Sequence, residues 1–141
     1  MTQVEALQVV ARFSRSGGLE LDAVAQALLR FAKILKQLDQ RTDCELLVPA
    51  DRTAHPYDGF LARLRLEKGE GGVQVYRDDE TLRIKGPYSG LEVLASNVEF
   101  LVSSTSRPNP HPYASHHIHE EYYDDHPYLA EDAEPLVINV V

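Results

Sequence analysis

Two segments of this sequence repeat apolar residues at helical spacing, and they are the feature that most constrains the fold. The first begins after Asp22, which we predict as its N-cap, and its stripe predicts a helix of about five turns. The second begins with Ser89 and Glu92 in the S-x-x-E spacing of a capping box. The expected buried stripes are Val24, Ala25, Leu28, Ala32, Leu35 and Leu38 in the first helix and Leu91, Leu94, Ala95, Val98, Leu101 and Val102 in the second.

Most of the remaining chain alternates apolar and polar residues with the period of two that is typical of β-strands. Residues 6–13 predict a half-buried first strand, and the run 60–86 predicts a meander of three antiparallel strands. In this meander we expect Leu64 and Leu66 to point inward and Leu61 outward. Further strands are expected in CELLVPA (44–50), in residues 114–123 and in EPLVINVV (134–141).

The predicted order of elements is therefore β-α-β-β-β-β-α-β-β. Two helices cannot cover both faces of a sheet of about six to seven strands, so we expect both on one face of a mostly antiparallel sheet. This is an α+β fold, a two-layer sandwich. Apolar residues at outward positions, such as Val10, Tyr76 and Val137, favour a homodimer through the open face or an edge strand. Scattered apolar surface residues are the alternative.

The chain of 141 residues is long enough for one domain with a core and too short for two ordinary ones. We therefore expect residues 1–141 to form a single domain. The segments RFSRSGGLE (12–20) and RIKGPYSGLE (83–92) resemble each other. They suggest a pseudo-repeat of two β-α-β units, 4–49 and 81–123.

Three further features predict a cytoplasmic protein. No apolar run approaches the roughly 20 residues of a membrane span. The start, MTQVEALQVVARF, lacks the basic and apolar regions of a secretory signal. Cys44 is the only cysteine, which excludes an internal disulfide, and we expect it to be a buried apolar residue.

Almost all of the net charge of −8 lies in the C-terminal quarter. The last basic residue is Arg107, and residues 108–141 hold seven acids without a single Lys or Arg, whereas residues 1–107 hold 14 basic and 15 acidic groups. Such a surface repels nucleic acid and anionic membranes and attracts a basic protein partner. A solvated acidic edge that aids solubility is the alternative interpretation.

The stretch ASHHIHEEYYDDHPYL (114–129) concentrates histidines and acids. If 114–123 is a strand, His117, His119 and Glu121 share one side, and His116, Ile118 and Glu120 share the other. An H-x-H pair on a strand is a spacing that chelates Zn or a similar divalent metal, with Glu121 or His126 as a third ligand. His55 is the sole distant candidate. A hydrogen-bonded polar strand is the alternative, and no other cofactor is expected.

Enzymatic activity is less well supported than binding. The sequence contains no nucleophile elbow and no glycine-rich loop with phosphate-binding spacing. His119 beside Glu121 is the one pair that would make an oriented base. These observations favour a binding protein over an enzyme.

Tyrosines among the acids favour a surface that contacts a protein. Tyrosine supplies contact area at low entropic cost, and acids steer a basic partner toward it. Tyrosines that only pack against the sheet edge are the alternative. The predicted contact residues are Glu120, Glu121, Tyr122, Tyr123, Asp124, Asp125 and Tyr128.

The segments TLRIKG, SGLEVLASNVEFL, HHIHEEYY, HPYL and EPLVINV, within about residues 72–141, resemble immunity proteins of bacterial polymorphic toxin systems. The matching motif residues are His117, His119, Glu121, Tyr122, Tyr123, Leu129, Leu136 and Val137. Residues 1–71 lie outside the resemblance, and Ala133 stands where a small hydroxyl residue is expected.

The resemblance implies a non-enzymatic cytoplasmic protein that blocks a cognate toxin. Two other hypotheses stay open at this point. One is a metal-binding protein, or a metal-dependent hydrolase, that uses the H-x-H strand. The other is a structural or accessory protein that assembles through its open sheet face.

Overall fold

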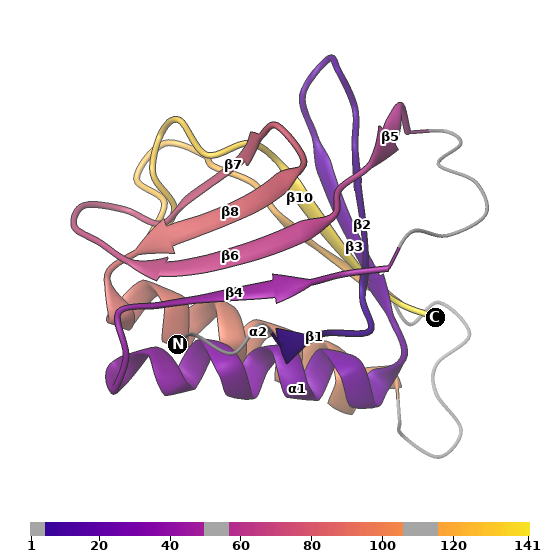
Figure 1. Cartoon of the computed structure of the whole chain (residues 1–141). Helices are drawn as coiled ribbons and strands as arrows, with labels where there is room; N and C mark the ends of the chain where they lie inside the picture. The colour runs from indigo at the N-terminus through magenta and orange to yellow at the C-terminus, as the bar shows by residue number, and fades with distance from the viewer. Residues whose placement is uncertain (1–4, 50–56, 106–115) are drawn as a thin grey trace.

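The computed structural model describes residues 5–49, 57–105 and 116–141. Within these residues the chain is α+β, with two α-helices, a short 3₁₀ helix and ten strands in two mixed five-stranded sheets (Figure 1). No described helix is long and apolar enough to cross a membrane. The elements are β1 (Glu5–Ala6), β2 (Val10–Phe13), β3 (Leu19–Ala23), α1 (Ala25–Lys36), η1 (Gln37–Asp39), β4 (Asp43–Leu47), β5 (Gly59–Phe60), β6 (Arg63–Lys68), β7 (Gln74–Asp78), β8 (Thr81–Gly86), α2 (Tyr88–Thr105), β9 (His117–Glu120) and β10 (Leu136–Val140).

The strands form two sheets. The prediction of a single, mostly antiparallel sheet of six to seven strands is therefore wrong. Sheet A has the order β1-β4-β6-β8-β7, and sheet B has the order β5-β2-β3-β10-β9. Each sheet contains parallel pairs: β1 with β4 and β6 with β8 in sheet A, and β3 with β10 in sheet B. The division arises because the chain crosses between the sheets within two apparently continuous apolar runs, at residues 7–9 and 61–62. Leu7 N–H donates to Leu47 O, next to sheet A, whereas Leu61 N–H donates to Ala11 O in sheet B.

The crossing at residues 61–62 also explains two wrong predictions. Leu61 was expected to point outward, yet it is buried, because the strand breaks between β5 and β6 and its alternation is reset. The predicted antiparallel meander of residues 60–86 is wrong as well. β7 and β8 form an antiparallel hairpin, but that hairpin places β8 beside β6 in a parallel pair and leaves β7 outside.

Strand β3 was not predicted. Gly17 and Gly18, both with φ near +100° (97° and 116°), turn the chain so that LELDA pairs antiparallel with β2. Asp22 therefore lies in this strand and accepts a hydrogen bond from Asn139, so its prediction as an N-cap is wrong. The N-cap of α1 is Val24, which makes no side-chain cap bond. The similar GLE segments also differ, since residues 18–20 enter β3 whereas residues 90–92 lie in α2.

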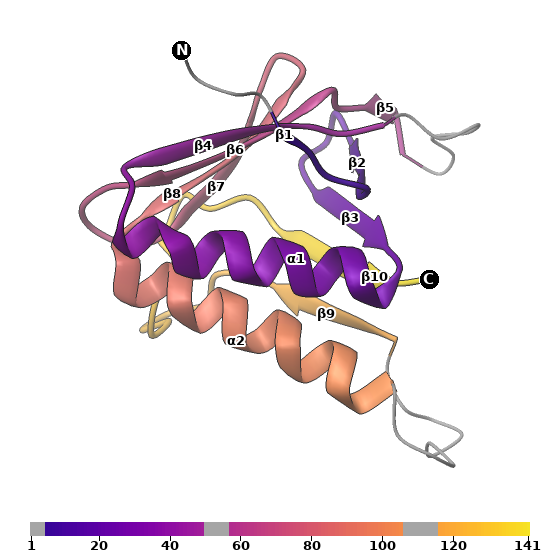
Figure 2. The ribbon, with the colours of Figure 1, turned by 60° about the horizontal axis from the view of Figure 1, so that its bottom comes forward.

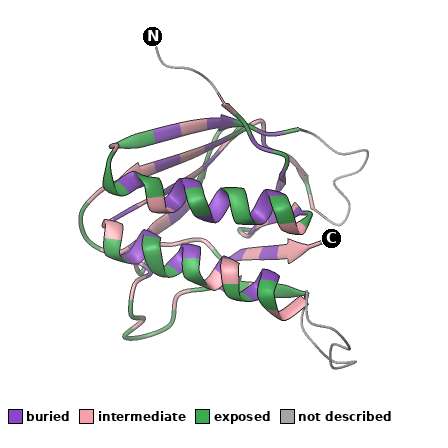
Figure 3. Ribbon diagram, turned by 90° about the horizontal axis from the view of Figure 1, so that it is seen from below, coloured by how far each residue is buried: buried purple, intermediate pink, exposed green. Residues whose placement is uncertain are grey.

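The two helices lie side by side along the sheets, with their buried faces turned toward the core (Figures 2 and 3). All six predicted stripe residues of α2 are buried, as are Leu28, Ala32, Leu35 and Leu38 from the first stripe, but Val24 is exposed. Ser89 is the second residue of α2 rather than its cap, so the predicted capping box is wrong. Glu92 instead accepts a hydrogen bond from the Tyr88 hydroxyl at 3.2 Å.

The C-terminal segment is tied to both sheets. Leu136 and Ile138 of β10 are buried, as predicted. Before β10, residues 128–134 run along β7, where Val73 N–H donates to Tyr128 O and Glu134 N–H donates to Val75 O, both at 2.7 Å. A Cβ atom at Gly72 would lie 2.7 Å from Ala130 N, so this close approach requires glycine. His55, residues 106–112 and the start of the predicted strand at 114 lie outside the described residues.

Candidate functional site

A hollow lies along β9. It has a volume of about 400 Å³ and is lined by the four residues of β9, by Asn97 and Phe100 of α2, and by residues of the following loop, which are Tyr123, His126, Pro127 and Tyr128. A neighbouring hollow of about 210 Å³ continues along Phe100, Leu101 and Ser104. We call these two hollows the β9 groove. Because successive strand residues point to opposite faces, a hollow lined by four of them in a row follows the edge of the strand.

The strand predicted over residues 114–123 is shorter in the structure, because residues 121–123 lie outside it; within β9 (His117–Glu120) the predicted alternation is confirmed. His117 and His119 are exposed, Ile118 is half-buried, and Glu120 is buried with 5% of its surface exposed. The sequence predicted Glu120 as part of an exposed contact surface. Because its side chain is buried, that prediction is wrong for Glu120. Its position on the inner side of the strand places its carboxylate against α2.

Glu120 is held by two donors from different elements. The Tyr128 hydroxyl donates to one carboxylate oxygen, and Asn97 Nδ2 donates to the other at 3.0 Å. Asn97 also lies 3.0 Å from the Tyr128 hydroxyl, which closes the triangle. Burial of the Tyr128 phenol, together with its hydrogen bond to Glu120, raises the pKa of Tyr128. The tyrosine is therefore a fixed donor, and the network joins β9, α2 and the loop.

His126 fixes the loop through its own ring. Its Nδ1 accepts hydrogen bonds from the backbone N–H groups of Tyr128 (3.2 Å) and Leu129 (3.0 Å), which requires Nδ1 to carry no proton. The ring also contacts Tyr123 and Tyr128, with centroid distances of 4.5 and 4.7 Å. The His126 ring therefore has a structural role in shaping this wall of the β9 groove.

The predicted metal ligands are only partly brought together. The rings of His117 and His119 meet edge to face at 4.9 Å between centroids. In the part of the chain that the structure describes, no group of three or more His, Cys, Asp or Glu side chains is arranged to hold a metal ion. Nδ1 of His126 is already occupied by backbone donors. A Zn site formed by His117, His119, Glu121 and His126 thus stays a prediction.

Of the remaining predicted contact residues, Tyr123 and Tyr128 line the groove, and the others lie in the same loop that follows β9. Glu121, Asp124 and Asp125 are exposed, Tyr123 is 59% exposed, and Tyr122 and Tyr128 are half-buried. Two more exposed acids, Glu131 and Asp132, follow in the loop. Among the described residues, no Lys or Arg forms an ion pair with any of these acids. We call the five acids the acidic surface.

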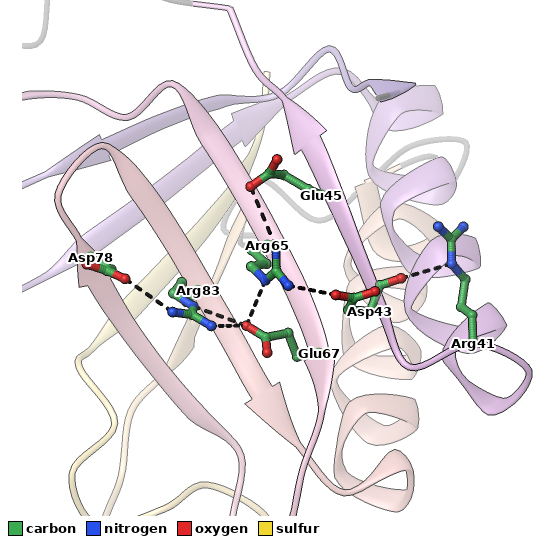
Figure 4. A network of polar contacts seen from close by, with 7 residues as sticks. All are labelled: Arg41, Asp43, Glu45, Arg65, Glu67, Asp78 and Arg83. Carbon is green, nitrogen blue, oxygen red and sulfur yellow. Dashed lines mark hydrogen bonds and ion pairs between the residues drawn. The ribbon is translucent and has the colours of Figure 1, made fainter. Parts of the chain in front are cut away.

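The outward face of sheet A offers the opposite arrangement. There, acids and arginines alternate across the strands and neutralise one another (Figure 4). Arg65 contacts Asp43 at 2.6 Å and Glu67 at 3.0 Å, and Arg83 reaches Glu67 and Asp78, the latter at 3.1 Å. Burial alone would raise the pKa of Glu67, but the hydrogen bonds and charges of Arg83 and Arg65 outweigh it and lower that pKa.

A second polar cluster lies on sheet B. Arg12 of β2 forms ion pairs with Glu20 and Asp22 of β3, and Asn139 of β10 donates to Asp22 at 2.5 Å. Burial and a hydrogen bond to Glu20 raise the pKa of Tyr57 to about 12. These groups satisfy one another across three strands, so we assign them to the stability of the sheet.

Sequence analysis did not identify Asn97 and Phe100 as site residues. Phe100 is 66% exposed although it is large and apolar, and it lines both parts of the β9 groove. One signal was available, because both residues fall outside the apolar stripe of α2. That signal does not show that the two residues face β9, because β9 begins only at His117, beyond the end of α2 at Thr105.

This sequence and structure match no protein-family model, no curated protein and no solved structure. The resemblance to immunity proteins therefore stays a prediction that rests on the quoted motifs.

Proposed function

We propose that this chain is a non-enzymatic cytoplasmic binding protein that inhibits a basic cognate protein, in the manner of an immunity protein. The observation that carries the proposal is the acidic surface beside the β9 groove, whose charges have no cationic partner within the described residues. In the same molecule, the acids of the sheet A face are neutralised by arginines. The contrast favours an external partner for the acidic surface.

Electrostatic attraction supports fast and selective association. Uncompensated acids on one surface raise the local concentration of a basic protein and speed its encounter. Tyr123, which is exposed between Glu121 and Asp124, offers aromatic contact area at the centre of this charge. Aromatic residues surrounded by polar ones are typical of the residues that dominate binding energy.

The surface is also held in a defined shape. The network of Glu120, Tyr128 and Asn97 joins the strand to α2. The loop is tied to sheet A because Val73 N–H donates to Tyr128 O and Glu134 N–H donates to Val75 O. A surface that is ordered before binding loses less conformational entropy when the partner arrives. This rigidity favours binding as the role of the segment.

The proposal is tested with the protein encoded by the reading frame adjacent to this gene. We expect a basic, growth-inhibiting product that forms a complex with this chain in titration calorimetry, and we expect co-expression to restore growth. Glu121→Lys combined with Asp124→Lys should weaken the complex at least about tenfold, because both changes reverse uncompensated charges next to the groove.

The control is Asp39→Lys combined with Glu80→Lys. Both residues are exposed and lie outside the acidic surface, and the pair changes the net charge by the same amount. We expect its affinity to stay within about twofold of the wild type. Equal weakening by both pairs, or an adjacent product that is neither basic nor bound, contradicts the proposal.

A further inference from the structure

We infer that the partner inserts an arginine side chain into the β9 groove, where its guanidinium pairs with the carboxylate of Glu120. This inference rests on the proposed function and names the group by which the basic partner is held. The observations that carry it are a buried acid without a cationic partner, a hollow that reaches this acid, and aromatic rings beside that hollow.

Glu120 differs from three other acids that are shielded from water. The side chains of Glu20, Asp22 and Glu67 are 14, 16 and 15% exposed, and each of them forms an ion pair with an arginine. Glu120 is only 5% exposed, yet no described Lys or Arg forms an ion pair with it. Removing a charge from water costs free energy, which a neighbouring cation normally offsets. Among the described residues, Glu120 thus lacks the cation that the other three acids have.

The two groups that do contact Glu120 are neutral. Asn97 Nδ2 donates to one carboxylate oxygen at 3.0 Å, and the Tyr128 hydroxyl donates to the other. Burial and the hydrogen bond to Glu120 raise the pKa of Tyr128, so this phenol stays protonated and remains a donor. A carboxylate has about four lone-pair positions, so each oxygen can accept a further hydrogen bond. The two donors therefore hold the carboxylate in place without cancelling its charge.

The hollow of about 400 Å³ provides access to this carboxylate. Glu120 and both of its donors are among the residues that line it. A flat contact surface does not reach a residue that is only 5% exposed, whereas a long side chain that enters the hollow does. Glu120 can therefore contact a partner although it does not belong to the exposed surface.

Aromatic rings beside the hollow favour arginine over lysine. Phe100 on α2 and Tyr123 in the loop are 66% and 59% exposed, and both line the hollow together with His126. A guanidinium is planar and weakly hydrated, it stacks on aromatic rings, and it donates to two oxygen atoms at once. The ammonium of lysine is a compact charge that is more strongly hydrated. Arginine therefore suits both the carboxylate and the rings.

The surroundings of the hollow favour the approach of a cation. No Lys or Arg is among the described residues that line either part of the β9 groove. Glu121, Asp124 and Asp125 follow β9 in the same loop, and their charges attract a basic segment toward this part of the molecule. The acidic surface thus steers the partner, and Glu120 fixes one of its side chains.

The probe is a pentapeptide with arginine between two pairs of glycines, acetylated and amidated at its ends, and its matched controls carry citrulline or lysine at the central position. Citrulline has nearly the shape of arginine but no charge. We expect the arginine peptide to bind the full chain and to shift the NMR signal of the Asn97 side-chain amide, because that group lies beside the carboxylate. The citrulline peptide should bind at least about tenfold more weakly, and the lysine peptide at least about threefold more weakly.

Two variants of the protein provide the second arm. Glu120→Gln removes the charge but keeps the length of the side chain and one acceptor oxygen, and Glu121→Gln makes the same change at the exposed neighbour. We expect Glu120→Gln to weaken binding of the arginine peptide at least about tenfold, and Glu121→Gln to weaken it only about twofold. If Glu120→Gln does not fold, the comparison of arginine with citrulline on the wild-type chain still decides the matter.

The outcomes separate this inference from the proposed function. Equal binding of the arginine and citrulline peptides, lysine bound as tightly as arginine, equal losses in the two variants, or no detectable peptide binding would each overturn the inference. A dimer in light scattering that Glu120→Gln dissociates would show that a second copy of this chain occupies the groove, and it would overturn the inference as well. The adjacent gene product and the charge reversal at Glu121 and Asp124 test the proposed function independently of these results.

Discussion

Two aspartate pairs in this protein share one backbone feature but differ in their ionic partners. Asp78–Asp79 joins β7 to β8 and Asp124–Asp125 follows β9, and in both pairs the second aspartate has a positive φ, of 55° and 63°. Asp78 is paired with Arg83 at 3.1 Å. Asp124 forms no ion pair with any described residue. The turn is a local property of the dipeptide, whereas its charge balance depends on which strand lies beside it.

The same contrast extends to the two regions that contain these turns. On the face of sheet A, β6 and β8 place Arg65 directly opposite Arg83, and Glu67 accepts from both, so the charges stabilise the sheet. In the acidic surface, Gln74 of β7 donates a hydrogen bond to Asp132 at 3.2 Å, and no Lys or Arg of the described residues forms an ion pair with any of the five acids. The charges of the first region pair with one another and stabilise the sheet, whereas those of the second have no Lys or Arg partner among the described residues, which is the difference on which the proposed binding function rests.

The comparison is sharpened most by Glu120, the buried acid of the second region. Glu120→Ala removes the acceptor of the Tyr128 hydroxyl and of Asn97, and it leaves these two half-buried donors without it. We expect a loss of about 2–4 kcal/mol in the free energy of unfolding, measured with urea. Glu121→Ala, the exposed neighbour, should change it by no more than about 0.5 kcal/mol. Equal effects of the two would mean that Glu120 belongs to the surface after all.

Glu67 tests the sheet A half of the comparison. Glu67→Ala leaves Arg65 and Arg83 facing each other without their shared acceptor, so we expect a loss of about 1–2 kcal/mol at neutral pH. Glu45→Ala, which removes an acid 3.8 Å from Arg65, should cost almost nothing. An identical loss of unfolding free energy in both variants would show that Glu67 contributes no more to the network than Glu45.

The same variant has a predicted pH dependence. The pKa of Glu67 is lower in the folded protein than its usual value of 4.5, so its contribution to stability is complete above that pH. It is lost as the pH falls through the lower, folded-state pKa. The stability difference between wild type and Glu67→Ala should therefore be largest near neutral pH and shrink in acid. Urea unfolding at about pH 7 and about pH 3 measures it, and a constant difference would contradict the assignment.

The smallest expected effect comes from the aspartate turns themselves. Asp78→Asn removes a partly exposed ion pair and should lower the unfolding free energy by about 0.5 kcal/mol. Asp124→Asn removes a negative charge that is repelled by the neighbouring acids. We therefore expect the free energy of unfolding to stay the same or to rise by a few tenths of a kcal/mol. Thermal unfolding of the two variants compares them directly. A larger loss for Asp124→Asn would reveal a stabilising partner for that acid and break the contrast.

Much of the secondary structure was predictable from the period of the apolar residues. The stripe of α2, most of the stripe of α1 and the alternation at residues 117–120 are as expected. Burial of a stripe or of one strand face depends on residues that are close in sequence, so a short window contains the signal. The missed strand β3 is instructive, because Leu19, Leu21 and Ala23 do alternate but precede a helical stripe at once.

The site was predictable only in part. The charge count indicated the segment that holds the exposed acids, but two structural facts were hidden from it. Glu120 turned inward to Tyr128 and Asn97, and Phe100 became part of a groove through a strand that begins 17 residues later. Neither contact has a local signal, because each depends on how β9 is placed against α2.

The sequence by itself therefore determined the two helices and most of the strands, the buried stripes of the helices apart from Val24 and Ala25, and where the negative charge accumulates. These are properties of short windows and of simple counting. The tertiary structure alone decided that the strands form two sheets, that β9 lies at an edge, and which acids have a cationic partner. Those outcomes depend on strand pairing between distant residues, where crossing at residues 61–62 or placing β8 beside β6 changes the neighbours of every side chain on the face.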